Sequence, residues 1–71
     1  MREVNQLDTI IKLENDIYII INNANKSQEL LKLLRKKSVR DIHTYEYYLL
    51  NARADLLWGM SIDDVILRSR Q

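Results

Sequence analysis

Apolar residues recur at helical spacing through the first third of the chain. Over residues 4–24 they fall into two seams with alternating steps of three and four residues, the repeat that places side chains on one face of a helix. A helix with two apolar seams contacts two neighbours. We therefore expect a helix over 4–24, whose first seam is Ile10, Leu13, Ile17, Ile20 and Ala24 and whose second seam is Leu7, Ile11, Glu14, Tyr18 and Ile21.

A cluster of asparagines interrupts this pattern. Asn22, Asn23 and Asn25 predict a turn, because Asn bonds its own backbone and tolerates left-handed conformations. Ser27 is then placed to cap a second helix over 27–37, since a serine hydroxyl can accept from the free amides at a helix start. The inner face of this second helix is formed by Leu30, Leu31, Leu33 and Leu34.

The sequence leaves open whether the second helix stops near residue 37 or continues, because its leucine seam does not continue in phase. Ser38 followed by Asp41 resembles a capping box and favours a new helix over 39–58. Gly59 supplies the left-handed residue that ends this third helix. Its predicted seam is Ile42, Tyr45, Leu49, Ala52 and Leu56.

Ser61 and Asp64 form another capping-box-like pair and predict a short last helix over 62–69. The chain has no Pro, and its one Gly, Gly59, is already assigned to a helix end. The pattern as a whole predicts an all-α fold. We expect a single domain over 1–71, built as a helical hairpin or three-helix bundle with a short C-terminal helix.

The small size of the chain points to a partner. A domain of 71 residues buries only about 60% of the surface of its unfolded chain, so its stability alone is marginal. The absence of Cys excludes a disulfide, and one His is too few for a zinc cluster. A second chain is the remaining source of additional stability, and we therefore expect a homodimeric helical bundle.

Composition excludes a membrane protein and names no charged partner. The longest apolar run covers only 17–21, whereas a membrane-spanning helix needs about 20 apolar residues. The formal net charge of +1 indicates neither a polycation nor an acidic tail. We expect a soluble, cytoplasmic protein without a membrane partner. The bias toward Ile, Asn and Lys is typical of an AT-rich genome, such as that of a phage or mobile element.

Catalytic chemistry has little support in the sequence. The chain has no Cys nucleophile, no Gly-rich phosphate loop and no Ser, His and Asp set at a known spacing. Its one histidine, His43, has Glu46 one turn later, and this pair supplies at most half of a metal site. We expect no enzymatic activity, no metal and no cofactor.

Aromatic residues of the third helix are candidates for a partner interface. Tyr47 and Trp58 point away from the seam of that helix and Tyr48 lies beyond its other edge, so the three cannot all be core. Tyr and Trp are favoured at interfaces because they bury a large area at small entropic cost. We expect the oligomer or partner interface to combine these aromatics with the first helix: Ile10, Leu13, Ile17, Tyr18, Ile20, Tyr47, Tyr48 and Trp58.

Glu14 lies within an apolar seam, where an unpaired carboxylate would cost several kcal/mol. Arg53 of the third helix projects at a similar seam edge and is a candidate donor. Two interpretations remain open. Glu14 either occupies a solvated gap at the edge of the seam, or forms a register-setting polar contact with Arg53 in an oligomer.

A basic face accompanies the second helix. Lys32, Arg35 and Lys36 project opposite its leucines, and Lys37 and Arg40 follow at its end. Such a face can bind the phosphates of a nucleic acid with salt-dependent affinity. Cations are also typical of the C-terminal turn and the solvated face of a helix, so the pattern alone does not decide between these roles.

Residues 51–70 resemble a helix-turn-helix in part, with Gly59 in the turn and Val65 as the buried residue of the second helix. Asp55 and Arg68 depart from the motif, because they stand where it carries small or apolar residues. A helix stop followed by a helix cap explains the same stretch more simply.

Two functions follow from these patterns. The first is a non-enzymatic protein–protein interaction module, a homo-oligomeric helical bundle that binds itself or a target protein. The alternative is a small nucleic-acid-binding regulator that places the basic face on phosphates and the C-terminal segment on bases. Only the alternative requires nucleic-acid binding with a steep salt dependence.

Overall fold

The computed structural model describes the backbone of residues 2–71 and the side chains from residue 5 onward. Over this range the chain is all-α, as predicted from the apolar spacing, and it contains no strand. Short turns separate four helices, which are α1 (Arg2–Ile21), α2 (Ala24–Lys37), α3 (Ile42–Leu57) and α4 (Ile62–Arg70).

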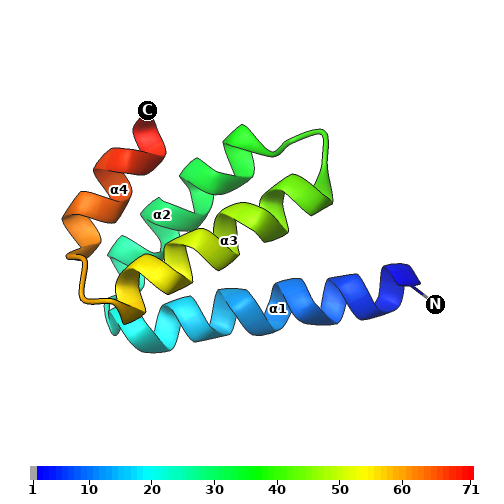
Figure 1. Cartoon of the computed structure of the whole chain (residues 1–71), viewed down its shortest axis with the longest axis horizontal. Coiled ribbons are helices and arrows are strands. Elements are labelled where there is room, and N and C mark those ends of the chain that lie inside the picture. The colour runs from blue at the N-terminus through cyan, green and yellow to red at the C-terminus, as the bar shows by residue number, and fades with distance from the viewer. Residues whose placement is uncertain (1) are drawn as a thin grey trace.

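Helices α1 and α3 lie side by side and run in the same direction, with α2 antiparallel to both (Figure 1). Two side-chain contacts define the register of α1 and α3. Gln6 Nε2 lies 2.8 Å from His43 Nδ1, and Arg53 Nε donates to Asp16 Oδ2 over 3.1 Å; each contact joins residues 37 apart. A constant separation is the signature of a parallel pair. Because α1 also packs against α2, it has two neighbours within its own chain.

The core forms where the inner faces of the four helices meet. Ile17, Leu30 and Leu49 are fully buried at its centre. The first predicted seam of α1 and the predicted faces of α2 and α3 therefore point inward, except for Ala24 and Ile42, which are exposed. The second predicted seam of α1 does not: Leu7 and Ile11 are exposed, and only Tyr18 and Ile21 pack partly against the core. The buried apolar residues are Ile10, Leu13, Ile17, Leu30, Leu31, Leu34, Tyr45, Leu49, Ala52, Val65 and Ile66.

The turn between α1 and α2 is shorter than predicted, and the prediction that Ser27 caps α2 is wrong. Asn23 is the N-cap, with its Oδ1 accepting from the Lys26 amide over 3.2 Å. Ser27 is fully buried inside α2, and its Oγ donates to the Asn23 carbonyl over 2.9 Å. Asn caps a helix as well as Ser does and comes earlier in the chain. A serine inside a helix can bond the carbonyl four residues back.

Helices α2 and α3 are separate, which settles the question that the sequence left open. Ser38 ends α2, with its amide donating back into that helix. Asp41, rather than Ser38, caps α3: its carboxylate accepts from the Thr44 hydroxyl and the His43 amide, each over 2.9 Å. These bonds stabilise the carboxylate and lower the pKa of Asp41. Helix α3 consequently begins at 42 instead of 39.

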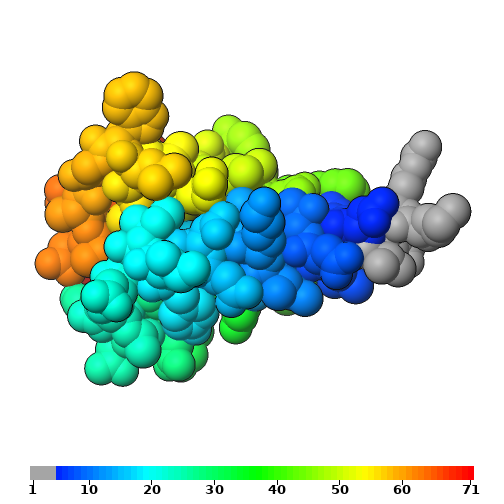
Figure 2. Space-filling model, turned by 90° about the horizontal axis from the view of Figure 1, so that it is seen from below, coloured from blue at the N-terminus to red at the C-terminus, as the bar shows by residue number. Residues whose placement is uncertain are grey.

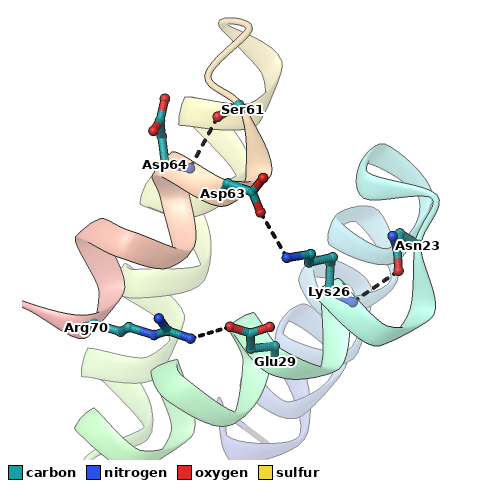
Figure 3. Close-up of polar contacts among 7 residues, drawn as sticks. All are labelled: Asn23, Lys26, Glu29, Ser61, Asp63, Asp64 and Arg70. Carbon is teal, nitrogen blue, oxygen red and sulfur yellow. Dashed lines mark hydrogen bonds and ion pairs between the residues drawn. The ribbon is translucent and has the colours of Figure 1, made fainter.

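The end of α3 and the start of α4 follow the prediction. Gly59 has a φ of +96°, a conformation that favours glycine. Ser61 then caps α4, with its Oγ accepting from the Asp64 amide over 3.2 Å (Figure 3).

Two ion pairs connect α4 to α2, one near the start of α4 and one near its end (Figure 3). Lys26 Nζ lies 2.9 Å from Asp63 Oδ1, and Arg70 Nη2 lies 2.6 Å from Glu29 Oε2. Exposed pairs of this kind each contribute less than about 1 kcal/mol. The packing of Val65 and Ile66 into the core therefore positions α4, and the ion pairs orient it.

Candidate interaction surface

One face of α3 remains apolar and uncovered. Tyr47, Leu50, Ala54 and Leu57 follow one another at steps of three, four and three residues, and all four are exposed. Trp58 extends this row directly after α3 ends. We call these five residues the α3 outer stripe. In the space-filling view the yellow surface of α3 borders the blue-to-cyan surface of α1 and is not covered by it (Figure 2).

Four of the five residues in the stripe have large side chains, and these are far from buried. Tyr47 is 61% exposed, Leu57 59% and Trp58 90%, while Leu50 retains 47%. Consecutive residues of α3 explain how both sides of the helix become apolar. Leu49 and Leu56 turn toward the core, whereas their successors Leu50 and Leu57 turn outward.

The residues predicted to form the interface divide into three groups. Ile10, Leu13 and Ile17 are buried in the chain's own core, so they cannot contact a partner in this conformation. Tyr18, Ile20 and Tyr48 are half-buried. Tyr47 and Trp58 are widely exposed and belong to the α3 outer stripe.

Three members of the stripe were not among the predicted interface residues. Leu50, Ala54 and Leu57 follow Tyr47 at seam spacing, so the signal was present in the sequence. Periodicity alone does not show how much of the apolar circumference of a helix the other helices cover.

Glu14 is paired within the chain, but not with the predicted donor. Its Oε2 accepts from Arg35 Nη2 over 2.8 Å and from the Tyr45 hydroxyl over 2.5 Å. Arg35 Nε also donates to the Tyr45 hydroxyl over 3.3 Å. The expected donor Arg53 binds Asp16 instead, because the register of α1 and α3 brings these two residues together. Glu14 thus joins α1, α2 and α3.

The environment of this cluster changes the ionisation of Tyr45. Burial raises the pKa of Tyr45 to about 12, and its hydrogen bond to the Glu14 carboxylate acts in the same direction. The hydrogen bonds to Glu14 and Tyr45 raise the pKa of Arg35. A neutral tyrosine and a charged arginine therefore share one carboxylate over the ordinary pH range. The arrangement links three helices of the bundle through hydrogen bonds to one side chain.

The basic face is partly occupied by contacts within the chain. Arg35 is held by Glu14, and Lys37 Nζ lies 5.6 Å from the centre of the Tyr48 ring, a cation–π contact. Lys32, Lys36 and Arg40 are exposed, and none of the three forms an ion pair with another side chain of residues 5–71.

The helix-turn-helix-like segment does form two helices, but its unusual residues bind each other. Arg68 Nη1 donates to Asp55 Oδ2 over 2.8 Å. Both residues line a shallow cavity of about 170 Å³ between α2, α3 and α4, together with Lys37 and Tyr48. The departures from the motif are thus explained by an ion pair across α3 and α4.

Metal clusters and membrane-spanning helices are both absent from the part of the chain that the structure describes. Within it, no three His, Asp or Glu side chains lie close enough together to hold a metal ion. None of its helices combines the length and the apolar character needed to cross a bilayer. Comparison of the chain with protein-family models, with curated proteins and with solved structures gave no match.

Proposed function

We propose that this chain is a non-enzymatic interaction module that associates with a second copy of itself through the α3 outer stripe. One observation carries the proposal: five exposed apolar or aromatic residues are continuous on a helix whose opposite face fills the core. Contiguous apolar surface on a small protein marks an interaction site. Tyr and Trp are enriched among the residues that dominate interface energies.

The stripe differs from the remaining exposed apolar residues by its extent. Outside the stripe, the exposed large apolar residues are Leu7, Ile11 and Ile19 on α1, Val39 in a turn, Ile42 at the start of α3 and Leu67 on α4. Single apolar residues on a surface are ordinary. Four helical positions in seam spacing followed by a tryptophan are the pattern by which one helix packs against another.

A matched pair of substitutions tests this proposal. Leu57 in the stripe and Leu67 on α4 are exposed to nearly the same degree, 59% and 57%. We expect Leu57→Lys to reduce the mass measured by light scattering from two chains to one, because a lysine in the interface would be desolvated. Leu67→Lys should leave the mass at two chains. Circular dichroism should show that both variants retain their helices.

Two results would contradict the proposal. The parent protein could have the mass of one chain at high micromolar concentration, which rules out self-association of useful strength. Alternatively, Leu57→Lys could remain a dimer, which would place the interface away from the stripe.

A nucleic-acid-binding regulator is the second candidate, and the exposure of Lys32, Lys36 and Arg40 favours it. If these cations bind phosphates, replacing all three by Gln should flatten the slope of log affinity against log salt by roughly one per lost contact. Our proposal predicts that neither the parent nor the triple variant binds a labelled random duplex near physiological salt. It also predicts an unchanged mass for the variant. Salt-steep binding by the parent that the variant loses would reverse the ranking.

A further inference from the structure

We infer that the second copy docks antiparallel, with the two α3 helices related by a two-fold axis that crosses the outer stripe at the level of residue 52. This inference rests on the proposed self-association and specifies how the two surfaces fit. Leu50 then lies opposite the partner's Ala54, and Tyr47 lies opposite the partner's Leu57. By symmetry each contact occurs twice, as in any interface between two identical patches.

Side-chain size favours this arrangement. The stripe carries its large residues at 47, 50 and 57 and its small residue at 54. The antiparallel pairing places a large leucine over the small alanine and a tyrosine over a leucine, so the gap between the helices stays even. A parallel pairing would place each residue opposite its own copy. Two alanines would then leave a void and two tyrosines would crowd, both of which cost stability.

Charge is compatible with the same arrangement. The stripe itself has no charged residue, and Arg53 is the charged residue at its edge nearest to the two-fold axis. The two Arg53 side chains would approach each other there, but each already binds Asp16 of its own chain over 3.1 Å. The axis therefore brings together two neutral ion pairs. Antiparallel helices also place opposite ends of their dipoles side by side.

The exposed area is sufficient for a dimer. Tyr47, Leu50, Leu57 and Trp58 keep between 47% and 90% of their surface exposed. Given the size of aromatic and leucine side chains, complete coverage of these four residues would bury roughly 600 Å² in each copy and about 1,200 Å² in the pair, the lower limit of stable interfaces. Trp58 follows the end of α3, so in an antiparallel pair it reaches the start of the partner's α3. We expect it to pack beside the partner's Thr44 and the partner's Tyr48.

Disulfide trapping tests the orientation, and the absence of Cys from the chain makes the experiment clean. Leu50→Cys and Ala54→Cys are prepared separately, one with a removable tag, and mixed in a glutathione redox buffer in which glutathione disulfide is the oxidant. The antiparallel pairing brings residue 50 within disulfide range of the partner's residue 54, but it does not bring either residue close to its own copy. We expect the mixed species to exceed either same-variant species by at least about tenfold, because only that pair has a high effective concentration. Leu67→Cys serves as the background control.

Each result supports or overturns the inference. Predominance of the mixed disulfide supports it. Predominance of disulfides between identical variants indicates a parallel pairing and overturns it. If light scattering gives two chains but all disulfides stay at the level of the Leu67→Cys control, the copies meet elsewhere and the inference is wrong while self-association stands. If the parent has the mass of one chain, the proposed function itself fails.

Discussion

Tyr45 connects the core to the polar cluster that joins the first three helices. Its ring is buried with Leu49 and Ala52, and its hydroxyl donates to Glu14 at the edge of the core. A hydrogen bond to a charged acceptor contributes about 1.5 to 3 kcal/mol. A buried aromatic ring with a paired hydroxyl therefore fixes both the depth and the rotation of α3 against α1.

The raised pKa of Tyr45 predicts a dependence of stability on alkaline pH. In the unfolded chain a tyrosine ionises at 10.0, whereas the folded chain raises the pKa of Tyr45 to about 12. The folded state thus holds the proton more tightly, and the associated stabilisation is complete below pH 10 and is lost as the pH rises to 12. Tyr45→Phe should be less stable than the parent at pH 8, and this difference should shrink between pH 10 and 12. Thermal melting of both proteins across this range measures the difference, and a constant difference would contradict the assignment.

The sequence identified Glu14 as a residue that needs a donor, but not which donor it uses. Periodicity gives the face on which a side chain lies. It does not give the relative direction of two helices, and the partner of Glu14 depends on that direction. In the parallel register, Arg53 meets Asp16, while Arg35 and Tyr45 converge on Glu14. The local sequence pattern therefore predicted that Glu14 needs a hydrogen-bond donor, whereas the tertiary fold determines which residues donate to it.

The turns that follow α1 and α3 each contain one residue with positive φ. Asn22 has a φ of 52° and Gly59 a φ of 96°, and they lie 37 residues apart, the same separation as the α1–α3 contacts. In each of these two helical hairpins, one residue with a left-handed backbone conformation lies in the turn where the chain reverses direction. Asn tolerates the conformation of Asn22, whereas the larger φ of Gly59 is suited to glycine alone.

This difference predicts opposite effects of substitution at the two turns. Gly59→Ala should lower the free energy of unfolding by about 1 kcal/mol. The loss is purely conformational, because no heavy atom lies within 4 Å of a Cβ built at this position. Asn22→Gly should preserve the free energy of unfolding or raise it by a few tenths of a kcal/mol. Chemical denaturation measures both. An unchanged Gly59→Ala protein would mean that this turn relaxes freely.

Helix faces were easier to predict than helix ends. The apolar seams located the inner faces of α1, α2 and α3 because burial imposes a strict period. Helix starts were less certain, since Asn23, Ser27, Ser38 and Asp41 can all cap a helix and local sequence does not rank them. Ser61 was predicted correctly because Gly59 left it as the first cap available to α4.

At the scale of the whole molecule, α1 no longer requires a second chain. Both of its neighbours, α2 and α3, belong to the same copy and bury Ile10, Leu13 and Ile17 of its first seam, whereas Leu7 and Ile11 of its second seam stay exposed. The more extensive row of exposed apolar side chains lies on α3, where no other helix of the described chain covers Tyr47, Leu57 or Trp58. The argument for a partner therefore moves from the first helix to the third.

The most direct test of the central claim uses Trp58, the only tryptophan of the chain. It is 90% exposed in the single copy and belongs to the proposed interface, so its fluorescence reports on association without a label. We predict that the emission maximum of the parent shifts to shorter wavelength as the concentration rises from nanomolar to high micromolar, because the indole becomes covered. Leu57→Lys should keep the long-wavelength emission throughout. An emission maximum that is independent of concentration while light scattering shows the mass rising from one chain to two would contradict the claim that the α3 outer stripe is the interface.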